Sequence, residues 1–339
     1  MINIENMNKS ELIELIENNS ETINDELKLQ ARKTCDKVFG NKVYLRGLIN
    51  ISSHCKNNCY YCGISGRNKK AERYRLSEAE ILSCCKTGNG LGVSTFVLQG
   101  GEDEIISDLD ICRTVSKIKD KYPDSVVTLS LGEKDKATYT EYFFAGADRY
   151  LLRHETASSE HYRKMHPKTM SLNRRKDCLR TLKEIGFQVG AGFMVGSPFQ
   201  TSETLAEDIL FLNKLKPHIV GVGPFIPHKD TKFAGYPPGS LELTLNLISM
   251  IRILLKDVLI PATTALGTIH EEGRELGIKH GANVVMSNLS PASVRKKYLI
   301  YDGKICVNEE ASESLNCLKE RVRNAGFEID MSSGDHPEF

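Results

Sequence analysis

The chain alternates eight short β-branched segments with longer amphipathic stretches, and this alternation limits the possible folds more than any other feature of the sequence. Strands are expected at residues 43–51, 95–99, 126–130, 149–152, 189–195, 219–223, 259–262 and 283–287. Strands that alternate with helices are typical of βα units around a parallel sheet, and eight such units close a barrel. The sequence therefore predicts an α/β fold of the (β/α)8 TIM-barrel class, with an open doubly wound sheet as the competing architecture.

Two helical patterns precede the first expected strand. Residues 8–18 begin with Asn8 and Glu11 at the positions of a capping box, and a second pattern ends at Gly40-Asn41. We find no low-complexity linker in the sequence that follows. We therefore predict a helical leader over residues 1–41, one barrel over residues 42–290 and a C-terminal extension over residues 291–339 that packs on the barrel. In a barrel of this class, catalytic residues lie at the carboxyl ends of the strands and on the loops after them.

The charge balance excludes several kinds of partner. Lysine and arginine number 45 against 44 aspartate and glutamate residues, so the formal charge is only +1 and offers little attraction to nucleic acid or acidic lipid. The first residues, MINIENMNKS, lack the apolar core of a secretory signal, and no apolar run approaches the ~18 residues of a membrane span. We therefore expect a cytoplasmic protein with neither a nucleic acid nor a membrane partner. Its ten cysteines are then expected to be reduced thiols, and unusual cysteine spacing points to metal binding or catalysis.

Three cysteines follow the first expected strand in CxxxCxxC spacing: Cys55, Cys59 and Cys62. Three thiolates on one short loop can bind three irons of a [4Fe–4S] cluster and leave the fourth iron without a protein ligand. A structural zinc ion is one alternative, because His54 could supply a fourth ligand, but neighbouring side chains do not easily reach one tetrahedral centre. Packing in an apolar core is the other alternative, and the polar residues of HCKNNCYYCG argue against it.

This cysteine motif, with the aromatic Tyr61 before its last cysteine, resembles the radical S-adenosylmethionine (SAM) superfamily. The resemblance implies that the amino and carboxylate groups of SAM bind the open iron, and that one electron from the cluster cleaves SAM to methionine and a 5′-deoxyadenosyl radical. In the family, the residue at the position of Tyr61 lies beside the adenine. The protein's share of such chemistry is to bind and orient the cofactors and to exclude water.

Further segments resemble the HydE family of [FeFe]-hydrogenase maturases; they read RYRLSEAEI, LQGGED, VTLSLGE, AGADRYLLRHETA, VGVGPFIPH, IPATTALGTI, GANVVMSN and DGKICV. This resemblance implies an enzyme of active-site (H-cluster) assembly that acts on a small sulfur- or iron-bearing, organometallic substrate. It also implies partners: a scaffold GTPase, a tyrosine-cleaving radical SAM maturase and a reducing electron donor.

The resemblance also assigns roles to individual residues. For SAM, Gly100, Gly101 and Glu102 are expected to receive the α-amino group, Glu155 the ribose hydroxyls and Arg174 the carboxylate, while Met194 lies against the adenine and Met286 near the adenosyl group. The expected lining of the substrate cavity consists of Thr128, Ser130, Arg153, Thr263, Thr264 and Tyr301. Hydroxyl groups beside an arginine suit an anionic or cyanide-bearing ligand.

The sequence departs from the HydE pattern near its carboxyl end. Many members carry a second cluster there, on three cysteines in Cx7CxxC spacing, but here the run contains Cys306, Ser314 and Cys317. A serine alkoxide forms far less readily than a thiolate, so we predict no stable second cluster. The remaining cysteines are interpreted as packing residues; these are Cys35, Cys84, Cys85, Cys112 and Cys178.

Two other functions stay open at this point. One is a carbon-skeleton mutase of the methylornithine synthase type, which shares the cysteine motif and manages without a second cluster. The other is a non-enzymatic iron–sulfur carrier or a zinc-stabilised scaffold.

Overall fold

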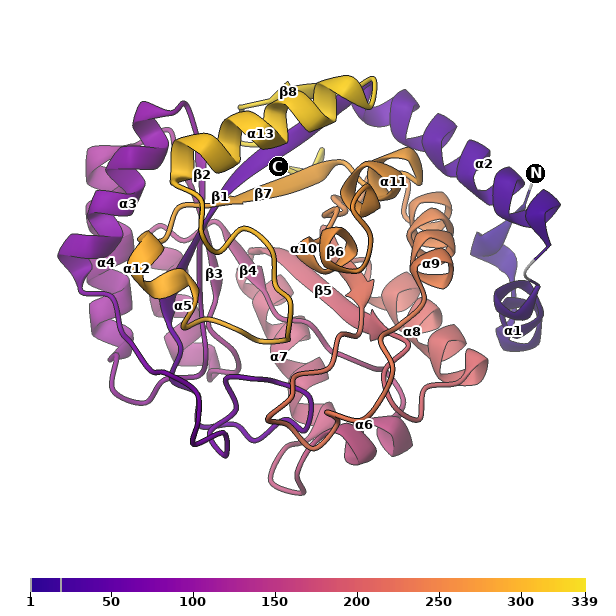
Figure 1. The fold of residues 1–339 in the computed structure, drawn as a ribbon, viewed down its shortest axis with the longest axis horizontal. Helices are drawn as coiled ribbons and strands as arrows, with labels where there is room; N and C mark the ends of the chain where they lie inside the picture. Colours follow the sequence, from indigo (N-terminus) through magenta and orange to yellow (C-terminus); the bar gives the residue numbers. More distant parts are fainter. Residues whose placement is uncertain (1, 19) are drawn as a thin grey trace.

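The strands of the barrel form one curled parallel sheet. The computed structural model describes residues 2–18 and 20–339, and within them the strand order is β6-β5-β4-β3-β2-β1-β7. The strands are β1 (Lys42–Ser52), β2 (Thr95–Gly100), β3 (Val126–Ser130), β4 (Arg149–Leu151), β5 (Gln188–Val195), β6 (Ile219–Pro224) and β7 (Val284–Asn288). Figure 1 shows these strands surrounded by helices. Seven of the eight expected strands are therefore present.

The eighth expected strand, residues 259–262, is reduced to isolated bridges that join the two edges of the sheet. Leu259 pairs with the start of β6 and Pro261 with the start of β7. The carbonyl of Leu259 accepts from the Val220 N–H at 2.9 Å, and the Ala262 N–H donates to the Val284 carbonyl at 2.8 Å. Pro261 has no N–H to donate, which limits the length of a strand here. The predicted α/β barrel is confirmed, with this segment closing the ring.

Helices follow the strands and cover the outside of the sheet. The barrel helices are α3 (Glu78–Gly90), α4 (Asp108–Lys121), α5 (Lys136–Phe144), α6 (Ser159–Met165), α7 (Leu172–Ile185), α8 (Ser202–Leu215), α9 (Leu241–Leu254), α10 (Thr264–Ile269) and α11 (Gly273–Lys279). Strand β1 shows how the core forms, because Val43, Leu45, Ile49 and Ile51 alternate with more polar residues and join the apolar core. The opposite face of β1 carries Arg46 and Asn50 into the barrel interior.

The leader and the segment after β7 pack on this barrel. The 3₁₀ turn Ile4–Asn6 and helices α1 (Lys9–Glu17) and α2 (Glu21–Phe39) come first, and α1 contacts α8 while α2 contacts α9 (Figure 1). The expected capping box of Asn8 and Glu11 is present, and α2 ends at Gly40 with φ 63°. After β7 come α12 (Ala292–Arg295), α13 (Ala311–Asn324) and β8 (Glu328–Asp330), which pairs with the start of β1. Within the described residues, no helix has the length and apolar character needed to cross a membrane.

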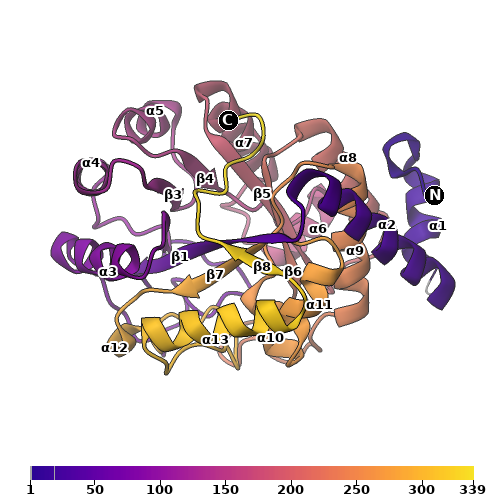
Figure 2. The same cartoon turned by 90° about the horizontal axis from the view of Figure 1, so that it is seen from above.

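The tail after β8 crosses the amino ends of the strands, as Figure 2 shows from above. The Ser333 carbonyl accepts from the Thr95 hydroxyl at 2.9 Å and from Arg149 at 2.8 Å. The Asp335 carboxylate lies 2.5 Å from Arg149 and accepts from Gln188 at 2.6 Å. Because Arg149 is fully buried inside the barrel, the tail supplies the counter-charge that this arginine requires.

We predict that Asp335→Ala destabilises the fold by about 2 kcal/mol. Removing one partner of a fully buried ion pair costs about 3–5 kcal/mol, and a smaller loss is expected here because the Asp335 side chain is 30% exposed. Urea unfolding measures the change. Glu328→Ala, an exposed acid on β8 in the same extension, is the control and should stay within about 0.5 kcal/mol of the wild type. Equal losses in the two variants would contradict the prediction.

The contribution of Asp335 should also depend on pH. Burial alone would raise the pKa of Asp335, but the charge of Arg149 and hydrogen bonds from Ser333 and Gln188 outweigh burial and lower the pKa below 3.8. A carboxyl group with a lowered pKa contributes stability that is fully present above its unfolded pKa and is lost as the pH falls through its folded pKa. The stability difference between wild type and Asp335→Ala is therefore expected to be constant near neutral pH and to shrink below about pH 3.8. A difference that grew on acidification would exclude this electrostatic origin.

Candidate active site

The three cysteines lie on a loop that begins at the carboxyl end of β1. Backbone hydrogen bonds connect this loop to three segments that are distant from it in the sequence. The Lys56 N–H donates to the Glu102 carbonyl at 2.9 Å, the Tyr60 N–H to the Met165 carbonyl at 3.0 Å and the Gly63 N–H to the Ile300 carbonyl at 2.9 Å. The loop is thus fixed at the catalytic end of the barrel, where the βα architecture places reactive groups.

Arg73 holds the same loop from within. Its guanidinium donates to the carbonyls of Ile64 at 2.8 Å, Ser65 at 2.7 Å and Asn68 at 3.1 Å, and also to that of Ser53. A guanidinium has five N–H donors in a fixed plane and can satisfy several carbonyls that would otherwise lack partners. Sequence reasoning did not select Arg73, although it lies in the RYRLS segment that resembles the family.

Gly101 is required for the close approach of β2 to the cysteine loop. A Cβ atom at this position would lie 2.2 Å from the His54 carbonyl oxygen and 2.7 Å from the Cys55 Cβ. The missing side chain therefore accommodates the loop itself, whereas the resemblance had assigned Gly100 and Gly101 only to the approach of SAM.

The three thiols of the loop lie in a desolvated environment. Burial raises the pKa of all three, that of Cys62 to about 12, so the thiolates need a nearby cationic group to form. Four ligands around one zinc ion, with Zn–S bonds of about 2.3 Å, stand within ~4 Å of one another. Among the described residues, the three cysteine sulfurs do not form such a compact set of potential ligands.

Among the described residues, only His218, His336 and Glu338 bring three potential metal-binding atoms within 4.8 Å of one another. Their hydrogen bonds exclude a metal site. The His218 Nδ1 accepts from the Val189 N–H at 2.8 Å, and the His336 Nδ1 accepts from the Glu338 N–H at 3.3 Å. A neutral imidazole whose Nδ1 accepts carries its proton on Nε2 and has no lone pair left for a metal. These residues anchor the tail at the opposite end of the barrel.

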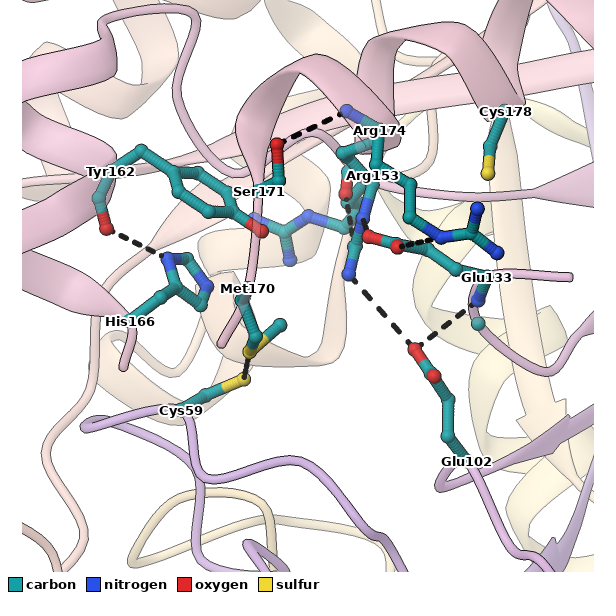
Figure 3. Close-up of polar contacts among 12 residues, drawn as sticks. Cys59, Glu102, Glu133, Arg153, Tyr162, His166, Met170, Ser171, Arg174 and Cys178 are labelled. Carbon is teal, nitrogen blue, oxygen red and sulfur yellow. Dashed lines mark hydrogen bonds and ion pairs between the residues drawn. The ribbon is translucent and has the colours of Figure 1, made fainter. Parts of the chain in front are cut away.

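Acidic and basic side chains meet beside the cysteine loop (Figure 3). Arg175, from α7, lies 2.5 Å from Glu133 and 4.0 Å from Glu102. Glu102 accepts from the Glu133 N–H at 3.2 Å, and burial raises its pKa. The expected Arg174 lies at the rim instead, with a side chain 58% exposed and 3.3 Å from Glu133. The NRR doublet gave no basis for choosing between the two arginines, and the structure places Arg175 in the interior.

The adenosyl side of the expected site contains Tyr61, Met194 and Glu155. The Tyr61 hydroxyl lies 3.1 Å from His166 Nε2, and Met194 belongs to an apolar cluster that Tyr61 contacts. Cys59 and Met170 approach each other at 3.9 Å between their sulfur atoms (Figure 3). Glu155 follows β4 with φ 68°, and its carboxylate lies 3.3 Å from Arg153. These residues come from three loops and from strand β5.

The barrel interior holds several polar groups without protein partners. Thr128 and Arg153, both expected from the sequence, have buried polar atoms that make no hydrogen bond, and the same is true of Arg46, Asn50 and Ser287. The last three were missed, although polar residues within the apolar strand KVYLRGLINIS were a usable signal. Ser130 ends β3 in register with Gln99. Unsatisfied groups of this kind are able to form hydrogen bonds with a ligand.

The other residues that the resemblance assigned to SAM or substrate lie on β7, at the start of α10 and in the segment after β7. Met286 lies on β7 in register with Arg46 of β1. Thr263 has a clear structural role as well, because its Oγ1 caps α10 by accepting from the Leu266 N–H at 3.4 Å. It sits so close to β6 that a Cβ on Gly223 would lie 2.7 Å from the same oxygen. Thr264 begins α10, and burial raises the pKa of Tyr301 to about 12.

The three C-terminal residues at the Cx7CxxC positions differ in their surroundings. Cys306 has φ 61° and lies 3.5 Å from Arg274, Ser314 is buried in α13, and Cys317 is exposed on the same helix. The other cysteines behave as packing residues: Cys35, Cys84, Cys85 and Cys178 are buried and Cys112 is half-buried.

Comparison with known proteins gives consistent matches. Residues 49–212 match the model of the radical SAM superfamily. The [FeFe] hydrogenase maturase subunit HydE of Thermotoga maritima is 43% identical over 320 residues, which cover 93% of this chain and 90% of the relative. The 3-methylornithine synthase of Methanosarcina barkeri is 31% identical over 299 residues, or 88% of this chain and 83% of the relative.

Among solved structures, the crystal structure of methylornithine synthase (PylB) aligns with a TM-score of 0.84 and 28% identity and covers 96% of each chain. The cysteine loop, the barrel and these matches lead to one assignment. The chain belongs to the radical SAM superfamily and, within it, is a HydE-like protein.

Proposed function

We propose that this chain is a radical SAM enzyme that acts in [FeFe]-hydrogenase maturation, in the assembly of the H-cluster. The observation that carries the proposal is the three-cysteine loop at the catalytic end of a barrel with a polar, unsatisfied interior. The 43% identity to the HydE subunit supports the choice of pathway. Residues 42–290 form the catalytic barrel in this proposal, and residues 1–41 and 291–339 pack on it.

Cys55, Cys59 and Cys62 are the ligands of one [4Fe–4S] cluster in this proposal. When bound, the cluster supplies one electron to SAM, whose reductive cleavage yields methionine and a 5′-deoxyadenosyl radical. The chain's own contribution is to fix the ligand loop through Arg73 and three backbone hydrogen bonds. A second cluster is not part of the proposal, because Ser314 and Cys317 differ so widely in exposure.

The residues around the loop divide the binding of SAM among them. Glu102 and the backbone of Gly100 and Gly101 receive the α-amino group, because a buried carboxylate attracts an ammonium strongly. Arg174 pairs with the carboxylate from the rim. Glu155 accepts from the ribose hydroxyls. Tyr61, Met194 and Met286 supply apolar surface for the adenine and adenosyl group.

In this proposal, polar side chains in and around the barrel interior bind the substrate. These side chains are Thr128, Ser130, Arg153, Thr263, Thr264 and Tyr301. Buried groups without partners cost about 1–3 kcal/mol each, and a ligand that satisfies them recovers that energy. The guanidinium of Arg153 and the hydroxyl groups suit an anionic, small sulfur- or iron-bearing substrate, and enclosure within the barrel keeps water from the radical.

Partners follow from this chemistry. A low-potential protein must deliver the electron, and the other maturases, a scaffold GTPase and a tyrosine-cleaving radical SAM enzyme, supply the substrate or receive the product. Reduced thiols at the site support a cytoplasmic location.

Methylornithine synthase activity is the second candidate, favoured by the TM-score of 0.84 to PylB. A hydrogenase maturation assay in extracts that lack the HydE protein separates the two functions. Restored hydrogenase activity supports the first function. Formation of methylornithine from an amino acid without such restoration would support the second, and a protein without 5′-deoxyadenosine formation would be an iron–sulfur carrier.

Cys59→Ala is expected to abolish cluster binding and SAM cleavage. The reason is that two thiolates cannot hold a site-differentiated cubane. Anaerobic reconstitution followed by iron analysis, electron paramagnetic resonance and 5′-deoxyadenosine measurement checks this. Cys317→Ala is the matched control, because it removes an exposed thiol and should leave iron content and cleavage unchanged. Loss of iron in the control would reveal a second cluster, and an unchanged spectrum in Cys59→Ala would refute the ligand assignment.

Arg153→Ala should leave SAM cleavage largely intact while reducing hydrogenase maturation at least about tenfold, because the lost contacts are to the substrate. The guanidinium pairs with Glu155 at 3.3 Å, but its Nε and Nη2 are buried and make no hydrogen bond, so they are able to bind a ligand. Uncoupled 5′-deoxyadenosine formation and the maturation assay give the two measurements. Arg163→Ala, an exposed arginine on α6, serves as the control. Loss of SAM binding in Arg153→Ala would place Arg153 in the SAM site instead.

A further inference from the structure

Glu155 is held in a backbone conformation that few side chains adopt. Its φ is 68°, in the left-handed region that favours glycine. Such a conformation persists at functional sites only where surrounding contacts fix the backbone. The contacts around this turn therefore decide where the carboxylate of Glu155 points.

His154 and Asp208 make contacts of this kind. Asp208, on α8, is fully buried, and its Oδ1 accepts from the Ala157 N–H at 2.5 Å and lies 3.1 Å from His154 Nε2. The His154 Nδ1 accepts from the Gly192 N–H of β5 at 3.3 Å. Since Nδ1 accepts, the proton of the neutral ring is on Nε2 and is donated to Asp208. Burial lowers the pKa of His154 to about 3, so the ring is neutral near pH 7.

The backbone on both sides of Glu155 is held as well. The Glu155 N–H donates to the Gly192 carbonyl at 3.0 Å. Arg175 donates to the Arg153 carbonyl at 2.9 Å, and Lys176 donates to the Ala157 carbonyl at 2.8 Å. The turn is thus fastened to α7, α8 and β5, and the His154–Asp208 pair is the connection to α8.

Packing alone does not explain why position 208 carries an acid and not an apolar side chain. Burial of a carboxylate costs free energy that an apolar side chain would not cost. The Asp208 hydrogen bonds that the structure shows are directed at the turn, and its other oxygen, Oδ2, has no hydrogen-bond partner among the described residues. The ring of His154 also packs against Phe211 of α8, with centroids 4.8 Å apart. The carboxylate therefore acts on the backbone of residues 154–157.

We propose that His154 and Asp208 are positioning residues for SAM: they fix the turn after β4 so that the Glu155 carboxylate faces the ribose hydroxyls. This inference rests on the proposed function, in which Glu155 binds the ribose. Neither residue needs to contact SAM.

The positioning role is tested by measuring how protein variants and ligand analogues together change the affinity for SAM. The reconstituted holoenzyme is titrated anaerobically with SAM and with its 2′-deoxy and 3′-deoxy analogues. The wild type is expected to bind at least one analogue about tenfold more weakly than SAM, equivalent to ~1.4 kcal/mol. Asp208→Ala should bind SAM about tenfold more weakly and discriminate between SAM and that analogue by less than about twofold. A general loss of stability would weaken all ligands alike and leave the discrimination unchanged.

Three further variants complete the design. Asp208→Asn keeps an oxygen that accepts from Ala157 and His154 and should restore discrimination. Glu207→Ala removes the neighbouring acid of α8, which pairs with Lys9, and is the matched control. His154→Phe keeps the ring packing and removes both hydrogen bonds, so it provides the same test if Asp208→Ala does not fold.

Glu155→Ala separates failure of this inference from failure of the proposed function. If it discriminates as the wild type does, the ribose assignment of Glu155 is wrong. If it loses discrimination while Asp208→Ala and His154→Phe keep it, the positioning role is overturned. Loss of discrimination in all three variants, with Asp208→Asn and Glu207→Ala unaffected, is the expected result.

Discussion

The attachment of the cysteine loop to the barrel is the interaction on which the rest of the site depends. The loop has no regular secondary structure that could satisfy its own carbonyl groups, so the guanidinium of Arg73 does so. The Gly101 backbone then packs directly on His54 and Cys55. A loop held in this way keeps its three sulfur atoms in place before any metal binds, which lowers the entropy that cluster binding must offset. The proposed roles of the half-buried thiols and of the unsatisfied polar groups in the barrel interior both depend on this fixed loop.

Much of the fold and the location of the site could be predicted, because they depend on local patterns. Alternating apolar segments located seven strands of the barrel, and the capping box located the first helix. Residues 259–262 form bridges instead of a strand because Pro261 lacks a donor, a local fact that the β-branched pattern concealed. The cysteine spacing identified the loop that follows β1.

Prediction was weaker where a role depends on three-dimensional neighbours. Nothing in the NRR doublet indicates that Arg175 is buried between two glutamates while Arg174 lies at the rim. Asp208 is one acid among several on α8, and only its hydrogen bond with the turn after β4 distinguishes it from the others. The role of Arg73 likewise became clear only from the four carbonyl groups that accept its hydrogen bonds. Side chains whose partners lie far away in the sequence carry no periodic signal, so their roles appear only once the chain is folded.

The hydrogen bonds that tie the cysteine loop to Met165 and Ile300 connect residues that are synthesised at very different times. During translation, Cys55, Cys59 and Cys62 emerge long before the segments that later cover them. Pairing of β1 with β7 is equally non-local, and contacts of this kind form slowly because a long loop must close first. The nascent thiols are therefore open to solvent, and to oxidants, until the second half of the barrel has folded. The order of synthesis thus leaves these three thiols unprotected until the contacts with Met165 and Ile300 have formed.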